Sequence, residues 1–270
     1  MLSVVRRGLI DDHRAPFNEG VDANLVLGVL LIGAGVGFIS GAFGKGGAAL
    51  STPLLHALGV PAMTAIASPL PATIPATWLA SRGYARAGHI DRDVVRIGVG
   101  VGIPLTALGA YLTRWVGGEA LVLTTDVMLL ALALRILLGA HDSSAVKELQ
   151  RVSRPRTIAV VAIAGAVSGL LGNSGGFLLA PLFMNVLHMP VRRALGTSLA
   201  LATVLAVPGT IVHAWLGHID WSLTFVFALG SIPLATLGAT LALRLRERSM
   251  SIAYGLGIAT LSAGLLAFTR

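Results

Sequence analysis

The sequence predicts an all-α polytopic membrane protein made of two inverted repeats, and three observations support this prediction. Of its 270 residues, 55% are hydrophobic and only 12% are charged, and the mean hydropathy of +0.82 lies well above that of soluble domains. The charges are confined to short stretches between long uncharged runs. Finally, the chain repeats itself at a spacing of 128 or 129 residues.

Several uncharged runs are long enough to cross a bilayer as helices, which takes about 20 apolar residues. The stretches without Asp, Glu, Lys or Arg are 24–43, 46–81, 97–113, 157–191, 221–243 and 249–269. None shows the alternation of a membrane β-barrel strand. The net charge of +8 comes from basic residues between these runs, so we expect it to set the topology and not to bind nucleic acid.

The internal repeat aligns two halves of the chain. SGAFGKGGAALSTP at 40–53 matches SGLLGNSGGFLLAP at 168–181, GHID at 88–91 recurs at 217–220, and IPLTALGA at 103–110 recurs as IPLATLGA at 232–239. We interpret these matches as a duplication. The predicted parts are an N-terminal tail at 1–23, which lacks the features of a signal peptide, a first transmembrane repeat at 24–140, a cytoplasmic linker at 141–156 and a second transmembrane repeat at 157–270.

Each repeat divides into five apolar segments. In order they are 24–43, 47–59, 62–82, 93–114 and 119–139 in the first repeat, and 157–171, 175–187, 191–214, 221–243 and 249–268 in the second. The second segment has only about 12 residues, so at 1.5 Å per residue it reaches about halfway across the membrane. We therefore expect a broken helical hairpin, closed by a Gly-rich turn, and three full transmembrane helices in each repeat.

Arginine placement predicts that the repeats are inverted. The loop between the third and fourth segments has four arginines in the first repeat and no Lys or Arg in the second. The next loop has the opposite bias, with Arg114 alone in the first repeat and three arginines in the second. Equivalent loops therefore face opposite sides if positive residues stay inside. The N-terminal tail, with Arg6, Arg7 and Arg14, disagrees because this topology places it outside.

Inverted repeats with broken helices are typical of secondary transporters, whose sites lie near the midplane where the broken helices meet. Two Gly-rich turns are expected there, each followed by a short helix whose free N–H groups face the turn. Their residues predict a site for a small anion, with backbone N–H groups, a charge from Lys45 and neutral donors from Asn173 and Ser174. The turn residues are Gly44, Lys45, Gly46, Gly47, Asn173, Ser174, Gly175 and Gly176.

Lys45 is the most unusual of these residues because an intramembrane lysine costs on the order of 3 kcal/mol or more. It needs a partner, a wet cavity or an anion, unless the turn is shallow and the side chain reaches an interface. The motif is not a phosphate loop, since Gly46 stands where Ser or Thr is required. The glycines at 33, 37 and 41, and at 165 and 169, are instead expected to pack helices together.

A few other polar residues lie in the apolar segments. The hydroxyls of Ser68, Thr197 and Ser198 are candidates to complete the anion shell, although such groups often bond their own helix. Asp126 and Arg135 are candidates for proton coupling, with interfacial anchoring as the alternative.

Two further features concern the helix starts and the chemistry of the chain. Asp91 and Asp220 precede the fourth segments, as N-cap residues do. The chain has no cysteine and shows neither metal-ligand spacing nor a nucleophile–base pair, so we expect no metal, no cofactor and no enzyme.

The paired motifs resemble the sulfite exporter TauE/SafE family of bacterial membrane proteins. Its hallmark is a duplicated Ser-Gly-x-x-Gly-x-Gly-Gly-Gly-x-x-x-x-Pro pattern, followed in each half by a Thr-Ser helix and a Gly-x-Ile/Val-Asp stretch. The pattern occurs here at 40–53 and 168–181, with Thr197-Ser198 and both GHID stretches. The chain departs from it at Ala48 and Ser174, which replace glycines, and at 67–69, where Ala-Ser-Pro replaces Gly-Thr-Ser.

The resemblance implies transport of a small sulfur-containing anion, sulfite or an organosulfonate, across the bacterial cytoplasmic (inner) membrane. We expect a multi-pass secondary transporter that exports this anion by alternating access around a midplane site. Its partners would be the anion and the lipid bilayer, and a homodimer is compatible with the sequence. Proton coupling through Asp126 and uniport both stay open. The alternative function is a passive anion channel with the same architecture.

Overall fold

The computed structural model describes residues 23–44, 50–137, 153–172 and 176–245, and all regular secondary structure in these ranges is helical. In the first half the helices are α2 (Ala23–Ala42), α3 (Ser51–Ala57), α4 (Ala62–Ala67), α5 (Pro69–Arg86), α6 (Arg92–Leu112), the 3-10 helix η4 (Thr113–Trp115) and α7 (Gly118–Leu137). In the second half they are α8 (Arg154–Leu170), α9 (Gly176–Asn185), α10 (Val191–Trp215) and α11 (Trp221–Arg244). The predicted tail, most of the linker and the segment at 249–268 lie outside the described residues.

Four of these helical stretches are long and apolar enough to cross a membrane. They are Ala23–Ala42, Arg92–Trp115, Val191–Trp215 and Trp221–Arg244. The predicted short second segment of each repeat is a helix of 7 residues in α3 and 10 residues in α9. One predicted segment, 62–82, is instead two helices, because α4 ends before Ser68 and α5 begins at Pro69. Proline has no N–H to continue the helix, whereas Ser198 at the equivalent position leaves α10 continuous.

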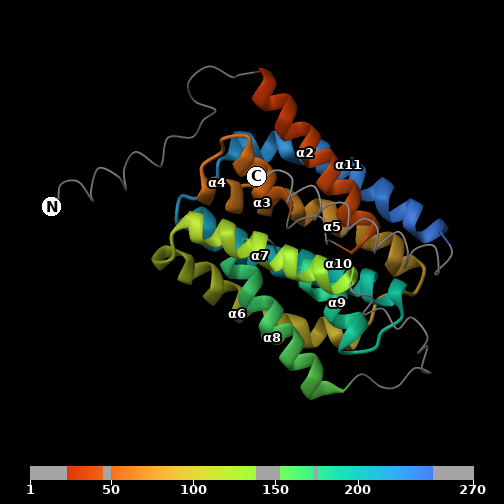
Figure 1. Cartoon of the computed structure of the whole chain (residues 1–270). Helices are drawn as coiled ribbons and strands as arrows, with labels where there is room; N and C mark the ends of the chain where they lie inside the picture. Colours follow the sequence, from red (N-terminus) through yellow and green to blue (C-terminus); the bar gives the residue numbers. More distant parts are fainter. Residues whose placement is uncertain (1–22, 45–49, 138–152, 173–175, 246–270) are drawn as a thin grey trace.

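Helices from the two halves are paired reciprocally. The first predicted segment of each half packs on the fourth segment of the other half, so α2 lies along α11 and α8 lies along α6. Likewise α5 packs on α11 and α10 packs on α6, and α5 and α10 contact each other. Figure 1 shows the red α2 beside the blue α11, with α6 and α8 on the other side of the molecule. The two halves therefore pack extensively on each other.

Glycines allow the paired helices to approach closely. A Cβ built at Gly33 would lie 2.6 Å from the carbonyl oxygen of Phe227 on α11, and at Gly37 and Gly41 it would overlap the backbone of the same helix. In the other pair, a Cβ at Gly165 would lie 3.0 Å from the carbonyl oxygen of Gly102, and at Gly169 it would overlap that of Thr106. The prediction that these spaced glycines pack helices is confirmed.

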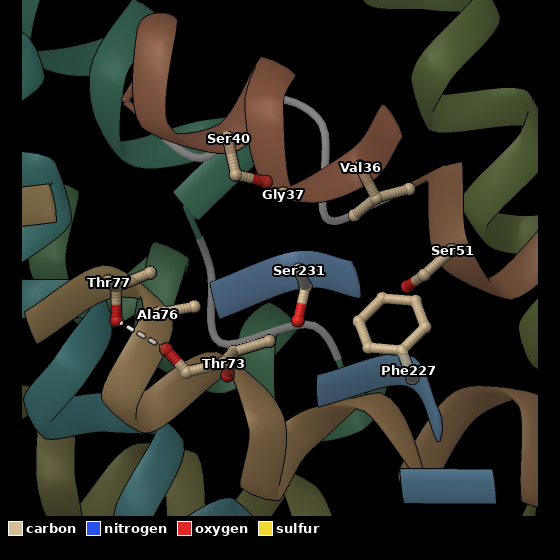
Figure 2. A pocket seen from close by; sticks show the side chains of 9 residues that line it. All are labelled: Val36, Gly37, Ser40, Ser51, Thr73, Ala76, Thr77, Phe227 and Ser231. Atoms are coloured by element: carbon tan, nitrogen blue, oxygen red, sulfur yellow. Dashed lines mark hydrogen bonds between the residues drawn. The ribbon is translucent and has the colours of Figure 1, made fainter. Parts of the chain in front are cut away.

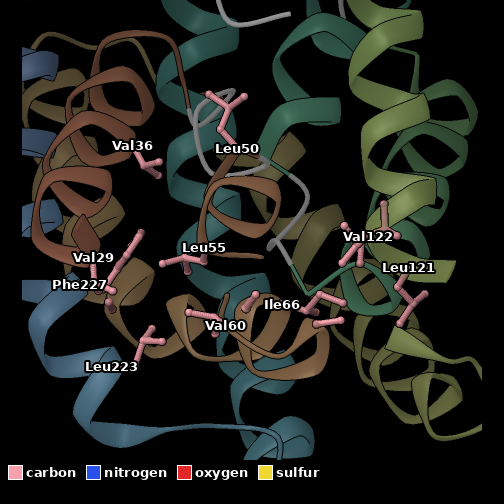
Figure 3. Packing of buried hydrophobic residues seen from close by; sticks show 14 of the residues in the cluster. Val29, Val36, Leu50, Leu55, Val60, Ile66, Leu121, Val122, Leu223 and Phe227 are labelled. Carbon is pink, nitrogen blue, oxygen red and sulfur yellow. The ribbon is translucent and has the colours of Figure 1, made fainter. Parts of the chain in front are cut away.

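Buried aliphatic side chains hold the short helices in place between the long ones. Figure 3 shows this cluster, in which Val29 of α2 and Phe227 of α11 lie near Leu55 of α3, and Ile66 of α4 lies toward Leu121 of α7. All five are at most 1% exposed. Large apolar side chains elsewhere, such as those of α2, α10 and α11 that face outward, are placed to contact lipid tails.

The GHID stretches start the fourth helix of each half. Gly88 and Gly217 both have φ of 74°, a left-handed conformation that favours glycine. The carboxylate of Asp91 accepts hydrogen bonds from the N–H groups of Asp93 and Val94, and Asp220 caps α11 in the same way. The predicted N-caps are confirmed, and the repeated tetrapeptide is explained by turn and cap geometry.

We expect Asp91→Ala to destabilise the protein more than Asp220→Ala, although both remove an N-cap. Asp91 also pairs with Arg193, with 2.9 Å between Nη2 and Oδ2, whereas Oδ2 of Asp220 is buried without a hydrogen-bond partner among the described residues. A cap is worth about 1 kcal/mol, and a charged hydrogen bond adds roughly 1.5–3 kcal/mol. Unfolding of both variants in detergent measures the difference, and equal losses of stability would contradict it.

Candidate functional site

The first residue of each predicted glycine turn has a backbone conformation that glycine adopts much more easily than other residues. Gly44 follows α2 with φ of 66° and Gly172 follows α8 with φ of 59°, and such left-handed residues commonly end helices. Both are buried against the other half: a Cβ at Gly44 would lie 2.7 Å from Cδ2 of Leu195, and at Gly172 it would overlap Ile66. Because Leu195 and Ile66 occupy equivalent positions of the repeat, the two turns start against matching places on α10 and α4.

Most of the turn residues lie outside the described part of the chain. These are Lys45, Gly46, Gly47, Asn173, Ser174 and Gly175, while Gly176 is the first residue of α9. Arg135 belongs to α7, and only its backbone is described. Their roles in binding or coupling therefore stay predictions.

The three predicted hydroxyl ligands are fully buried and bond to backbone groups across the repeats. Ser198 Oγ lies 3.0 Å from the carbonyl oxygen of Gly44 and 2.8 Å from that of Leu195, and donates to them. Thr197 Oγ1 accepts the N–H of Asp91, and Ser68 Oγ accepts the N–H of Asp220, each at 2.9 Å.

Of these three hydroxyls, Ser198 alone borders a glycine turn in the described structure. Ser68 and Thr197 tie the third segment of each half to the helix cap of the other half. The part of all three in anion binding stays a prediction.

A pocket lies between α2, α3, α5 and α11 (Figure 2). The pocket has a volume of about 20 Å³. The lining residues, all uncharged, are Val36, Gly37, Ser40, Ser51, Thr73, Ala76, Thr77, Phe227 and Ser231. Five of the nine carry hydroxyls, but the surface that lines the pocket is almost entirely apolar.

The hydroxyls of this pocket differ in how they are bonded. Thr73 donates to the carbonyl oxygen of Leu70 at 2.7 Å, and Thr77 lies 2.7 Å from that of Thr73 and 2.8 Å from Oγ1 of Thr203. The Oγ atoms of Ser40 and Ser231 are buried with no hydrogen-bond partner among the described residues.

Sequence reasoning did not single out this pocket. Its only local signals are Ser40 in the repeated Ser-Gly motif and the hydroxyls of Thr73 and Thr77, one helical turn apart. Ser231 comes from the other half of the chain, so no spacing in the sequence joins it to the rest.

Asp126 lies on α7, away from the residues that line the pocket. Its Oδ1 is buried without a hydrogen-bond partner among the described residues, and α7 packs on α3 and α4. Nearby, His56 of α3 pairs with Glu119 of α7, with 3.4 Å between Nε2 and Oε2. The coupling role of Asp126 stays a prediction.

Comparison with known proteins agrees with these features. The model of the family described as Sulfite exporter TauE/SafE matches residues 29–265. A "Probable membrane transporter protein" of Xylella fastidiosa (strain 9a5c) is 31% identical over 222 residues, which cover 80% of this chain and 85% of the relative. The Bacillus subtilis (strain 168) "Probable membrane transporter protein YjnA" is 25% identical over 234 residues, 82% of this chain and 92% of the relative.

No solved structure gave a significant match to the chain. The family match spans both repeats and both glycine motifs, and it confirms the resemblance identified from the sequence. With its apolar helices, the chain is a multi-pass membrane protein, and it belongs to the sulfite exporter TauE/SafE family.

Proposed function

We propose that the chain is a secondary transporter that exports a small sulfur-containing anion, sulfite or an organosulfonate, across the bacterial cytoplasmic membrane. The description of its family and the names of its relatives support a membrane transporter. The main observation behind the proposed mechanism is a pair of reciprocal contacts. Gly44 packs on α10 of the second half, and Gly172 packs on α4 of the first.

This reciprocity supports an inverted repeat. The contacts α2–α11, α5–α11 and Gly44–Leu195 have the counterparts α8–α6, α10–α6 and Gly172–Ile66, as expected if a pseudo-two-fold axis relates the halves. The opposite arginine bias of equivalent loops supports an axis that lies in the membrane plane. The two glycine turns would then enter the membrane from opposite faces and meet near its middle.

Such an arrangement is suited to alternating access. The first residue of each turn, Gly44 or Gly172, packs on a helix of the other half. A rocking motion of one half would therefore change both contacts together. The anion would be held by backbone N–H groups of the turns and by the charge of Lys45. Asp126 is a candidate for proton coupling, and uniport is the alternative.

The proposal is tested by ligand-induced stabilisation of the purified full-length chain. We expect sulfite or methanesulfonate to raise the thermal midpoint, since a ligand at about 100 times its Kd adds about 2.7 kcal/mol, while chloride at equal ionic strength does not. In liposomes, uptake of labelled substrate should saturate and show counterflow. Absence of both stabilisation and flux would contradict anion transport, and single-channel currents would replace the transporter with a channel.

A further inference from the structure

Where α3 packs on α7, one histidine of α3 faces two carboxylates of α7. His56 Nε2 lies 3.4 Å from Oε2 of Glu119, and the charge of His56 also acts on Asp126. The two acids are seven residues apart in the sequence, so they lie about two turns apart on one side of α7. Three groups that can bind a proton are therefore gathered at the contact between these two helices.

The exposure of the three groups decreases along α7. The side chain of Glu119 is 79% exposed and that of His56 is 34% exposed, whereas Oδ1 of Asp126 is buried without a hydrogen-bond partner among the described residues. A buried carboxylate oxygen without a partner is unfavourable and would be relieved by a proton. The cluster therefore leads from a carboxylate in contact with water to a carboxylate oxygen that is shielded from it.

The hydrogen bond of the imidazole leaves one of its nitrogens available. His56 Nδ1 lies 3.1 Å from the carbonyl oxygen of Val60, and because a carbonyl can only accept, Nδ1 carries the proton of the neutral ring. Nε2, on the side of Glu119, is then the nitrogen that can bind a second proton. Histidine is the side chain that ordinarily gains and loses a proton between pH 5 and 8.

Few other charges bear on this imidazole. The other helices that pack closely on α3 are α2 and α4, and neither has a titratable side chain. Within the described part of the chain, the groups facing His56 are therefore Glu119 and Asp126.

The cluster exists in one half of the chain only. At the spacing of the repeat, the counterparts of its three residues are Met184, Arg248 and Gly255, and they include neither a histidine nor an acid. If the repeats are inverted, the cluster serves one face of the membrane. With the positive residues inside, this is the outer face, because the loop before α7 lies opposite the basic linker.

We propose that His56 is the entry site for a proton that is exchanged for the exported anion. A hydronium ion outside gives its proton to Nε2 of the neutral imidazole and becomes water. The imidazolium then gives this proton to the carboxylate of Asp126, which becomes a neutral carboxyl group, and His56 returns to its neutral form. The inference rests on the proposed function, to which it adds the coupling ion and its point of entry.

The test measures accumulation of labelled methanesulfonate in liposomes that contain the full-length chain. This anion stays ionised over the whole pH range, so pH acts on the protein and not on the probe. The lumen is about one pH unit more acidic than the medium, and the membrane potential is clamped at zero. One-for-one exchange then supports at most about a tenfold accumulation, since one pH unit and a tenfold concentration ratio are the same free energy.

The variant is His56→Asn, because the asparagine amide can still donate to Val60 while Nε2 is lost. The matched control is His89→Asn, since His89 is also partly buried and lies in the first GHID stretch, outside the cluster. Size-exclusion profiles and thermal midpoints establish that each variant is folded. His56→Gln replaces His56→Asn if the latter does not fold.

We expect the parent and His89→Asn to accumulate the anion several-fold, and His56→Asn to reach a ratio close to one. Counterflow of methanesulfonate at equal pH on both sides should stay within about twofold of the parent in all three proteins, because exchange of anion for anion moves no net proton. Asp126→Asn should behave like His56→Asn. Loss of accumulation with retained counterflow distinguishes a proton site from a residue that only holds the structure.

Parent-like accumulation in folded His56→Asn would overturn the proton site and leave anion transport standing. Loss of both accumulation and counterflow in this variant would also overturn it, because His56 would then support the fold and not the proton. A parent that shows counterflow but ignores the pH difference is a uniporter, which overturns the coupling alone. A parent that moves neither methanesulfonate nor sulfite would overturn the proposed function as well.

Discussion

Gly41→Leu is expected to prevent the chain from accumulating as a folded protein. A Cβ at this position would overlap the carbonyl oxygen of Ala235 on α11, and backbone atoms cannot move aside as a side chain can. The leucine would therefore separate α2 from α11 along their whole contact. Overpacking that neighbouring side chains can relieve lowers the free energy of unfolding by about 1–3 kcal/mol. We expect Gly41→Leu to lower it by more than about 3 kcal/mol. Gly169→Leu should act in the same way on α8 and α6, because a Cβ there overlaps Thr106.

The matched control is Gly35→Leu on the same helix, since a Cβ there meets nothing within 4 Å. Its side chain would point outward, so yield and thermal midpoint should stay close to those of the parent protein. Fluorescence-detected size exclusion of tagged variants measures all three. Normal folding of Gly41→Leu, or equal damage from Gly35→Leu, would show that the close approach of α2 and α11 is wrong.

Lys45→Gln is expected to weaken anion binding strongly in a protein that still folds. If the lysine meets the anion in a site shielded from water, removing its charge leaves the anion without its main electrostatic partner. Truncating one member of a buried charge pair typically costs 2–5 kcal/mol or more, and about 2 kcal/mol corresponds to a roughly thirtyfold higher Kd. Titration with sulfite and flux in liposomes measure the loss.

Two controls separate a role in the site from a general effect of charge. Lys45→Arg keeps the positive charge and should retain much of the affinity. Lys147→Gln removes the same charge from the predicted cytoplasmic linker and should change nothing. Parent-like binding and flux in a folded Lys45→Gln variant would place the lysine at an interface, outside the site.

The sequence was most informative where the signal is local. The GHID stretches predicted helix caps, and Asp91 and Asp220 are caps, because an N-cap depends only on the next three residues. The short second segments were visible from their length and are α3 and α9. The break at Ser68 was missed, although Pro69 marked it, because the segment reads as continuously apolar at 62–82.

In the candidate site too, the features with a local signal were predicted and the long-range contacts were not. The glycine turns were recognised from a repeated motif, and the left-handed Gly44 and Gly172 agree with it. The hydroxyls of Ser68 and Thr197 were identified as polar residues in apolar helices, but their bonds to Asp220 and Asp91 join residues more than 100 positions apart. Which groups a hydroxyl bonds depends on the neighbouring helix, and hydropathy does not identify that neighbour.

By itself the sequence indicated an all-helical membrane protein, with a Gly-rich motif in each half and Asp residues that cap α6 and α11. These properties follow from hydrophobicity, backbone conformation and capping, all of which act over a few residues. Only the tertiary structure decided that α2 packs on α11 and α8 on α6, and that a pocket exists between α2, α3, α5 and α11. A cavity is the space that side chains from several helices leave between them. Its presence therefore depends on how those helices pack, which no single stretch of sequence specifies.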